Sequence, residues 1–265
     1  MLNMHYLVWN MAPDIVQFGP LRLRWYGLFF ALAFLSGYLI MAQIYRREGR
    51  SLENLADLFA YLFFGTIIGA RLGHVLFYQP DYYLAHPSEI LMIWQGGLAS
   101  HGGFAGVIIA VYLYLKKHRD MNFLQLADRL AIPCLLAATL IRIGNFFNSE
   151  ILGTPSNLPW AIVFARVDNI PRHPAMLYEA GAYLLAFCAL YVAYMKTTVN
   201  QFPGRILGMT LVICFIARFM IEFVKENQVP FEEHLVLNMG QLLSIPFIVA
   251  GAYLIYLSCK KAPAT

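Results

Sequence analysis

Seven stretches of about 20 mostly apolar residues dominate this chain of 265 residues. A helix of that length crosses the hydrocarbon core of a bilayer, because each residue adds about 1.5 Å along the helix axis. The stretches cover residues 26–45, 55–78, 98–115, 124–147, 174–195, 204–224 and 239–258. They predict an all-α, polytopic integral membrane protein with about seven transmembrane helices and a single domain over residues 1–265. The shorter apolar segment 88–95 is expected to be interfacial or re-entrant.

The low charge of the chain supports this class. Charged residues make up 13% and hydrophobic residues 60%, whereas soluble domains carry about 25% charged residues. A soluble nucleic-acid-binding protein, a disordered chain and a secreted disulfide scaffold are therefore improbable, and no nucleic-acid partner is expected. The four cysteines lie in apolar runs without a C-x-x-C pair, which is typical of buried hydrophobic residues. Residues 1–20 lack the pattern of a cleaved signal peptide, so the first span is expected to be retained.

The 19 basic residues are distributed unevenly around the predicted spans. One side carries Arg46, Arg47, Arg50, Lys116, Lys117, Arg119, Lys196, Arg205, Lys260 and Lys261. The other side carries Arg22, Arg24, Arg166, Arg172 and Lys225. Cytoplasmic loops are enriched in lysine and arginine. The bias therefore predicts an N-terminus outside and a cytoplasmic C-terminus.

Several polar residues inside the spans lie at one predicted depth. They are Arg71, Arg142 and Arg218 near the outer ends of three spans, and Tyr26, His101, Tyr178, Glu179 and Gln241 near the outer starts of the other four. Charges inside a membrane are costly and usually face a cavity or a partner. The shared depth indicates one polar site in the outer half of the bilayer. Because arginine binds phosphate bidentately, an amphiphile with an anionic headgroup, namely a phospholipid, is the expected ligand.

Structural roles for these residues remain open alternatives. Arg218 has Glu222 at position i+4 and could simply form an ion pair with it, whereas Arg142 has no carboxylate at i±3 or i±4. His101 stands between the pairs Gly96-Gly97 and Gly102-Gly103. These glycines could admit a ligand, or they could serve close helix packing, which is common in membranes.

The segment from Arg142 to Gly153 resembles the signature G-R-x-G-N-F-hydrophobic-N-x-E-x-x-G of the prolipoprotein diacylglyceryl transferase family. His101-Gly102-Gly103 is similar to the H-G-G of that family. Weaker matches are Trp25-Tyr26-Gly27, Gly69 to Gly73, Arg172-His173-Pro174, Leu177-Tyr178-Glu179, Arg218 with Glu222, and Met239-Gly240-Gln241 with Ser244. Two positions depart from the pattern: Ile141 replaces the leading glycine, and Cys214 replaces a tyrosine that many members carry.

The resemblance implies a reaction: the diacylglyceryl group of phosphatidylglycerol passes to the thiol of the lipobox cysteine in a prolipoprotein signal peptide. A thioether forms and glycerol phosphate is released. The resemblance also implies a multi-pass protein of the bacterial inner (plasma) membrane, with the active site toward the periplasm or outer leaflet. Its partners would be phosphatidylglycerol, the signal peptide and the lipid bilayer. No cofactor and no metal is expected, because no group of residues resembles a set of metal ligands.

Residue roles follow from this implied chemistry. Arg142 and Arg218 are the candidates for meeting the oxygen that gains charge as the phosphate leaves. His101 suits the role of base for the substrate thiol, because histidine titrates near neutral pH, but it could equally orient the headgroup. The further candidate substrate-binding residues are Tyr26, Arg71, Gly102, Gly103, Asn145, Asn148, Glu150, Gly153 and Glu222.

Other functions fit less well. A retinal protein needs a lysine in mid-span, and all six lysines lie at span ends. Residues 98–102 do not give Ser100 the G-x-S-x-G setting that a rhomboid-like protease would need. The alternative that stays open is a membrane transporter for an anionic solute or lipid. Such proteins often contain internal repeats and bind at the midplane, and neither feature is evident in this sequence.

Overall fold

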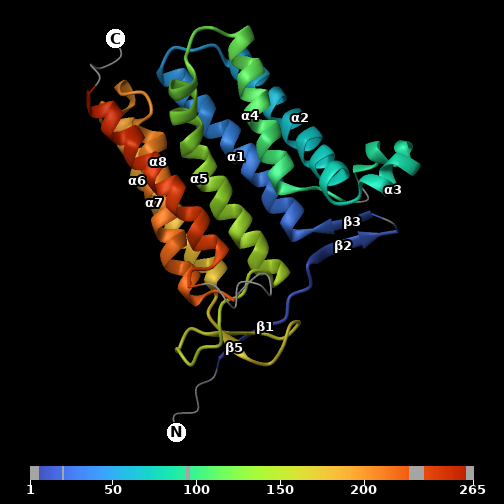
Figure 1. Cartoon of the computed structure of the whole chain (residues 1–265). Coiled ribbons are helices and arrows are strands. Elements are labelled where there is room, and N and C mark those ends of the chain that lie inside the picture. The colour runs from blue at the N-terminus through green and yellow to red at the C-terminus, as the bar shows by residue number, and fades with distance from the viewer. Residues whose placement is uncertain (1–5, 20, 94–95, 227–235, 261–265) are drawn as a thin grey trace. The chain divides into compact units, whose positions relative to one another are not determined.

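Helices dominate the computed structural model, which describes residues 6–19, 21–93, 96–226 and 236–260 (Figure 1). The long helices are α1 (Trp25–Arg47), α2 (Leu52–Phe77), α4 (Ser100–Lys117), α5 (Phe123–Asn148), α6 (Ala175–Lys196), α7 (Arg205–Ile221) and α8 (Met239–Lys260). Each of the seven predicted stretches is helical, with ends shifted by a few residues. Lys261 and two residues of the predicted interfacial segment, 94 and 95, lie outside the described residues.

Six described helices are long and apolar enough to cross a membrane: α1, α2, α5, α6, the stretch Arg205–Val224, and α8. They confirm an all-α polytopic membrane protein. Helix α4 is not among the six. It has 18 residues, begins with Ser-His-Gly-Gly and ends with two lysines, which lowers its hydropathy. A seventh crossing by α4 therefore stays a prediction.

Short elements complete the fold. The short helices are α3 (Pro80–Ala85), η1 (Pro87–Leu91), η3 (Val199–Gln201) and η4 (Glu222–Val224). The strands are β1 (Leu7–Trp9), β2 (Asp14–Phe18), β3 (Leu21–Arg24), β4 (Ile162–Phe164) and β5 (Pro171–Arg172). These strands differ from the purely helical pattern that the sequence predicts. Most of them are too short to show a strand periodicity. Strand β1 pairs with the distant β4, whereas β2 and β3 form a local hairpin in which Phe18 lies opposite Leu21.

The chain divides into two compact units: residues 41–126 form the smaller unit, and residues 1–40 with 127–265 form the larger unit. In the smaller unit, α2 and α4 pack through glycines. A Cβ added to Gly69 would overlap the carbonyl oxygen of Gly102 and lie 2.8 Å from the Cα of Gly106. Only glycine permits backbones to approach this closely.

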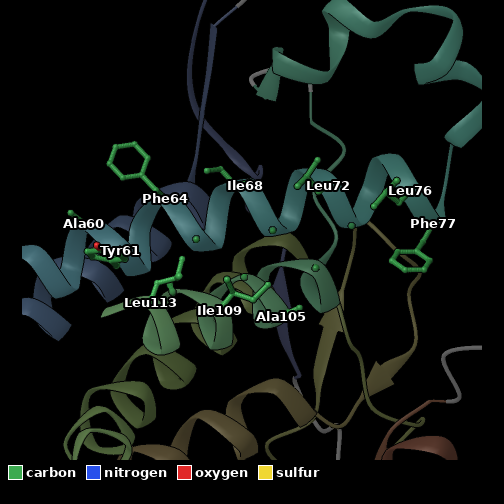
Figure 2. Close-up of a pocket in the computed structure, with 16 residues that line it drawn as sticks. Ala60, Tyr61, Phe64, Ile68, Leu72, Leu76, Phe77, Ala105, Ile109 and Leu113 are labelled. Atoms are coloured by element: carbon green, nitrogen blue, oxygen red, sulfur yellow. The ribbon is translucent and has the colours of Figure 1, made fainter. Parts of the chain in front are cut away.

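A groove of about 630 Å³ runs along the contact between α2 and α4 (Figure 2). Figure 2 shows Phe64, Ile68 and Leu72 of α2 on one side, and Ile109 and Leu113 of α4 on the other. Its walls are almost wholly apolar. The groove therefore offers hydrocarbon surface and lacks the ionisable groups that phosphate chemistry requires.

In the larger unit, α7 packs against both α6 and α8. The buried carboxylate of Asp128 on α5 accepts hydrogen bonds from the backbone N–H groups of Gly204 at 2.6 Å and Leu207 at 2.7 Å. A carboxylate is favourable at a helix N-terminus, because free N–H groups and the helix dipole point toward it. Asp128 thus fixes the start of α7, the helix that carries Arg218.

A small sheet in the order β1-β4-β5 lies beyond the C-terminal end of α5 (Figure 1). Strand β1 is parallel to β4, with Val8 opposite Val163, and β4 is antiparallel to β5. Beneath the sheet, Trp9 packs on Phe146 with ring centroids 4.1 Å apart. Phe146 also joins Phe164 in one buried cluster. This cluster anchors the end of α5, which carries the signature segment.

We expect Gly69→Ala to destabilise the smaller unit by about 1–3 kcal/mol, because the new methyl group overlaps backbone atoms of α4 that cannot move aside. Gly181→Ala on α6 is the matched control, since a Cβ there meets no atom within 4 Å. Thermal unfolding of the purified protein in detergent measures both effects. Equal midpoints for the two variants would contradict the packing role of Gly69.

Candidate functional site

Arg142 lies near the C-terminal end of α5 and pairs with Glu179 of α6. Its Nε is 2.6 Å from Glu179 Oε2, and its Nη1 donates a hydrogen bond of 3.2 Å to Asn145 Oδ1. The Glu179 side chain is 0% exposed. The sequence spacing had indicated no carboxylate partner for Arg142 on its own helix. The structure provides one from another helix.

Lys225 is the second cation beside Glu179. Its Nζ is 3.2 Å from Glu179 Oε1 and 2.7 Å from Glu222 Oε2, and its side chain is only 4% exposed. The sequence placed Lys225 beyond the end of a span without a partner, and the structure buries it between two carboxylates. Its spacing of three residues from Glu222 was the available signal.

Arg218 forms the outer end of this charged group. Its Nη2 is 3.9 Å from Glu222 Oε1, and its side chain is 29% exposed. The expected pair with Glu222 therefore exists, but Glu222 lies closer to Lys225. Cations and carboxylates alternate in the order Arg142, Glu179, Lys225, Glu222, Arg218. We call these five residues the charged chain.

The start of α8 packs against Glu222. A Cβ on Gly240 would overlap the Glu222 carboxylate, so a larger residue here would displace that carboxylate. The side chain of Asn238 donates a hydrogen bond of 3.3 Å to the Glu222 carbonyl oxygen. Asn238 and Gln241 also bond to each other's backbone N–H, which fixes this helix start. The common depth predicted for Gln241 and the arginines stays a prediction.

The asparagines of the signature segment hold Glu150. Asn145 Nδ2 donates to Glu150 Oε2 at 3.0 Å, and Asn148 Nδ2 donates to Glu150 Oε1 at 3.1 Å. Asn145 therefore links Glu150 to Arg142. The turn that follows α5 is tight, because Ser149 and Ile151 both have positive φ angles, 56° and 59°. Positive φ is costly for residues other than glycine, so this turn is maintained by its surroundings.

Tyr26 and Gly153 pack against the same region. A Cβ on Gly144 would lie 3.1 Å from Tyr26 Cδ2, which places the tyrosine ring against the signature helix. A Cβ on Gly153 would lie 2.5 Å from the carbonyl oxygen of His173 and 2.7 Å from that of Val224. Gly153 is therefore required for backbone packing between two segments. Substrate contacts by Tyr26 and Gly153 stay predictions.

Arg172 forms ion pairs with two carboxylates, one in the segment between α5 and α6 and one after η4. Its Nη2 is 2.6 Å from Asp168 Oδ2, and its Nη1 contacts Glu226 Oε1. The hydrogen bond from Arg172 holds the pKa of Asp168 below its ordinary value. The Asp168 carboxylate therefore stays ionised at neutral pH, and the pair is retained there.

The smaller unit contains the remaining predicted site residues. Arg71 is 4% exposed and donates hydrogen bonds to the carbonyl oxygens of Glu89, Ile90, Gly96 and Gly97 at 2.5, 2.8, 2.7 and 3.1 Å. These contacts show Arg71 organising the loop before α4. A substrate contact by Arg71 stays a prediction.

His101 lies in the first turn of α4, and its side chain is exposed. Gly102 packs against the backbone of Gly69, and a Cβ on Gly103 would lie 3.5 Å from Ala70 Cβ. The structure thus gives Gly102 the packing role, whereas a Cβ on Gly103 would make only an ordinary contact. Direct roles of Gly102 and Gly103 in substrate binding stay predictions. His101 and the charged chain belong to different units, so their predicted meeting also stays a prediction.

Comparison with known proteins supports the family resemblance. The family model described as prolipoprotein diacylglyceryl transferase matches residues 13–257. A protein of Tolumonas auensis named phosphatidylglycerol–prolipoprotein diacylglyceryl transferase is 49% identical over 96% of this chain and 98% of its own length. Proteins of the same name from Chloroherpeton thalassium and Bacteroides fragilis are 48% and 41% identical, over 97% and 96% of this chain and 96% and 95% of their own lengths. The chain therefore belongs to the prolipoprotein diacylglyceryl transferase family.

Proposed function

We propose that this protein transfers the diacylglyceryl group of phosphatidylglycerol to the thiol of the lipobox cysteine in a prolipoprotein signal peptide. The observation that carries the proposal is the charged chain, in which Arg142 and Arg218 stand at the two ends of a buried series of ion pairs. The names of relatives that are 41–49% identical over nearly the full length support the same activity.

The proposed reaction asks for positive charge at the phosphate. The sulfur of the substrate thiolate attacks the glyceryl carbon that bears the phosphate, and a carbon–sulfur bond forms. The carbon–oxygen bond to the phosphate breaks, and glycerol phosphate leaves with the electron pair. Arg142 and Arg218 stabilise the oxygen that gains charge, as preorganised donors do in many active sites. His101 accepts the thiol proton, because the thiolate is the reactive form of cysteine.

The membrane setting follows the charge distribution of the loops. We infer seven crossings, α4 included, with the N-terminus outside and the C-terminus in the cytoplasm. An α4 of 18 residues is about 27 Å long, close to the thickness of the hydrocarbon core. In this orientation Arg142 and Arg218 lie toward the periplasmic face of the bacterial inner membrane. Anionic lipid of the outer leaflet then reaches them directly.

A direct assay tests this function. Purified protein is mixed with phosphatidylglycerol and a peptide that contains a lipobox cysteine, and the peptide mass is measured. We expect a gain of one diacylglyceryl group on the cysteine. Anion flux through the protein in proteoliposomes without any peptide lipidation would instead support the transporter alternative.

We expect Arg142→Ala to lower the transfer rate by at least roughly 10²–10³-fold, because a donor to the leaving phosphate is lost. The variant should still fold, since Glu179 keeps Lys225 as a partner. Arg166→Ala, which changes an exposed arginine of the larger unit, is the control and should transfer at the wild-type rate. Normal transfer by Arg142→Ala would exclude the phosphate role.

We expect His101→Gln to lower the transfer rate by roughly 10²–10⁴-fold, the usual contribution of a general base. Glutamine keeps the size and the hydrogen-bonding capacity of the side chain but cannot accept the thiol proton. His86→Gln, at another exposed histidine of the smaller unit, is the matched control. A His101→Gln variant with nearly full rate would remove the base assignment and leave a headgroup contact.

A further inference from the structure

Lys225 occupies the centre of the charged chain. Its ammonium group lies 3.2 Å from Glu179 and 2.7 Å from Glu222. The second oxygen of each carboxylate faces an arginine, at 2.6 Å from Arg142 Nε and at 3.9 Å from Arg218 Nη2. Lys225 is thus the group through which the two arginine–carboxylate pairs contact each other.

We propose that Lys225 is a positioning residue that sets both the geometry and the net charge of the phosphate-binding arginines. The proposal rests on the proposed function. Lys225 engages one oxygen of each carboxylate, so each carboxylate is oriented with its other oxygen toward an arginine. The two arginines are thereby held at the two ends of one rigid unit, and Lys225 itself needs no contact with the substrate.

The charge balance points to the kind of ligand. The charged chain contains three cations and two carboxylates, which leaves one positive charge in excess. Glu150 reaches Arg142 only through Asn145, and its own side chain is exposed. One excess charge complements a phosphodiester monoanion such as the headgroup of phosphatidylglycerol. Without Lys225 the arginines would be fully balanced by the two carboxylates, and the attraction for an anion would weaken.

The backbone holds Lys225 in place independently of its side chain. Lys225 forms an antiparallel bridge with Gly153 of the signature segment. On its two sides, the N–H of Thr154 donates to the Val224 carbonyl at 2.9 Å, and the N–H of Glu226 donates to that of Leu152 at 3.2 Å. The glycine at 153 permits this close approach. Part of the signature segment therefore serves to place the lysine.

A purely structural role would also explain a lysine between two buried carboxylates, because a buried carboxylate without a partner is strongly destabilising. The two roles differ in one measurable property. A structural lysine affects how much protein folds, whereas a lysine that sets the charge of the site also changes the preference of the folded protein for an anionic headgroup.

The experiment compares Lys225→Arg, Lys225→Met, the double variant Lys225→Met/Glu222→Gln, and the exposed-lysine control Lys116→Met. Each protein in neutral detergent is titrated with phosphatidylglycerol or with zwitterionic phosphatidylcholine, and bound lipid is counted by native mass spectrometry. The ratio of the two affinities does not depend on the folded fraction. The KM for phosphatidylglycerol and kcat are measured with the lipobox peptide.

We expect Lys225→Met to lower the phosphatidylglycerol preference and to raise KM by roughly tenfold to a hundredfold, with a smaller change in kcat. Lys225→Arg should keep both values near those of the wild type. The double variant should regain much of the preference, because removing the Glu222 charge restores one excess positive charge. Lys116→Met should behave like the wild type.

An unchanged headgroup preference in Lys225→Met, or no recovery in the double variant, would overturn the proposal. If Lys225→Met fails to fold, the double variant and Lys225→Arg test the proposal instead. A folded double variant with a reduced preference for phosphatidylglycerol would contradict the charge role of Lys225. A wild-type protein that prefers phosphatidylglycerol but lipidates no peptide would refute the proposed function alone. If the wild type lipidates the peptide and Lys225→Met keeps the wild-type preference for phosphatidylglycerol, only the role of Lys225 is refuted.

Discussion

One fully buried carboxylate determines the arrangement of the larger unit. Glu179 is 0% exposed, and removing a carboxylate from water costs several kcal/mol unless cations face it. Arg142 on α5 and Lys225 after α7 supply those cations. Three segments that are distant in sequence must therefore meet at one side chain. The position of Arg142 is set by this pairing together with the hydrogen bond to Asn145 on its own helix.

The short strands and the connecting segment outside the helices serve this arrangement. Gly153 lies between the backbones of His173 and Val224, where no Cβ fits. Arg172 joins the same layer to Asp168 and Glu226. These contacts fix the backbone on both sides of Lys225. The contacts of Gly153 and Arg172 thus hold the connecting segments in one arrangement, as preorganised sites require.

The sequence predicted the helices well, because the length of an apolar run is a local property. It also indicated a common depth for Arg142, Arg218 and Glu179, since depth follows from position along a span. It missed Lys225, because a lysine beyond a span end is normally solvated. It missed the partner of Arg142 for a related reason: spacing along one helix reveals pairs such as Arg218 with Glu222, but not pairs between helices. The sequence did not reveal β1 and β4, because these three-residue strands pair over a long sequence distance.

The residues proposed to bind the phosphate and the residue proposed to accept the thiol proton lie in different units. Arg142, Arg218 and Lys225, the three cations of the charged chain, all belong to the larger unit. His101 belongs to the smaller unit, where Gly102 serves the packing of α4 against α2. A positive field that stabilises a leaving phosphate also favours the thiolate over the thiol. Under the proposed function, the positive charge of the charged chain favours both the leaving phosphate and the thiolate. His101 is proposed separately as the group that accepts the thiol proton.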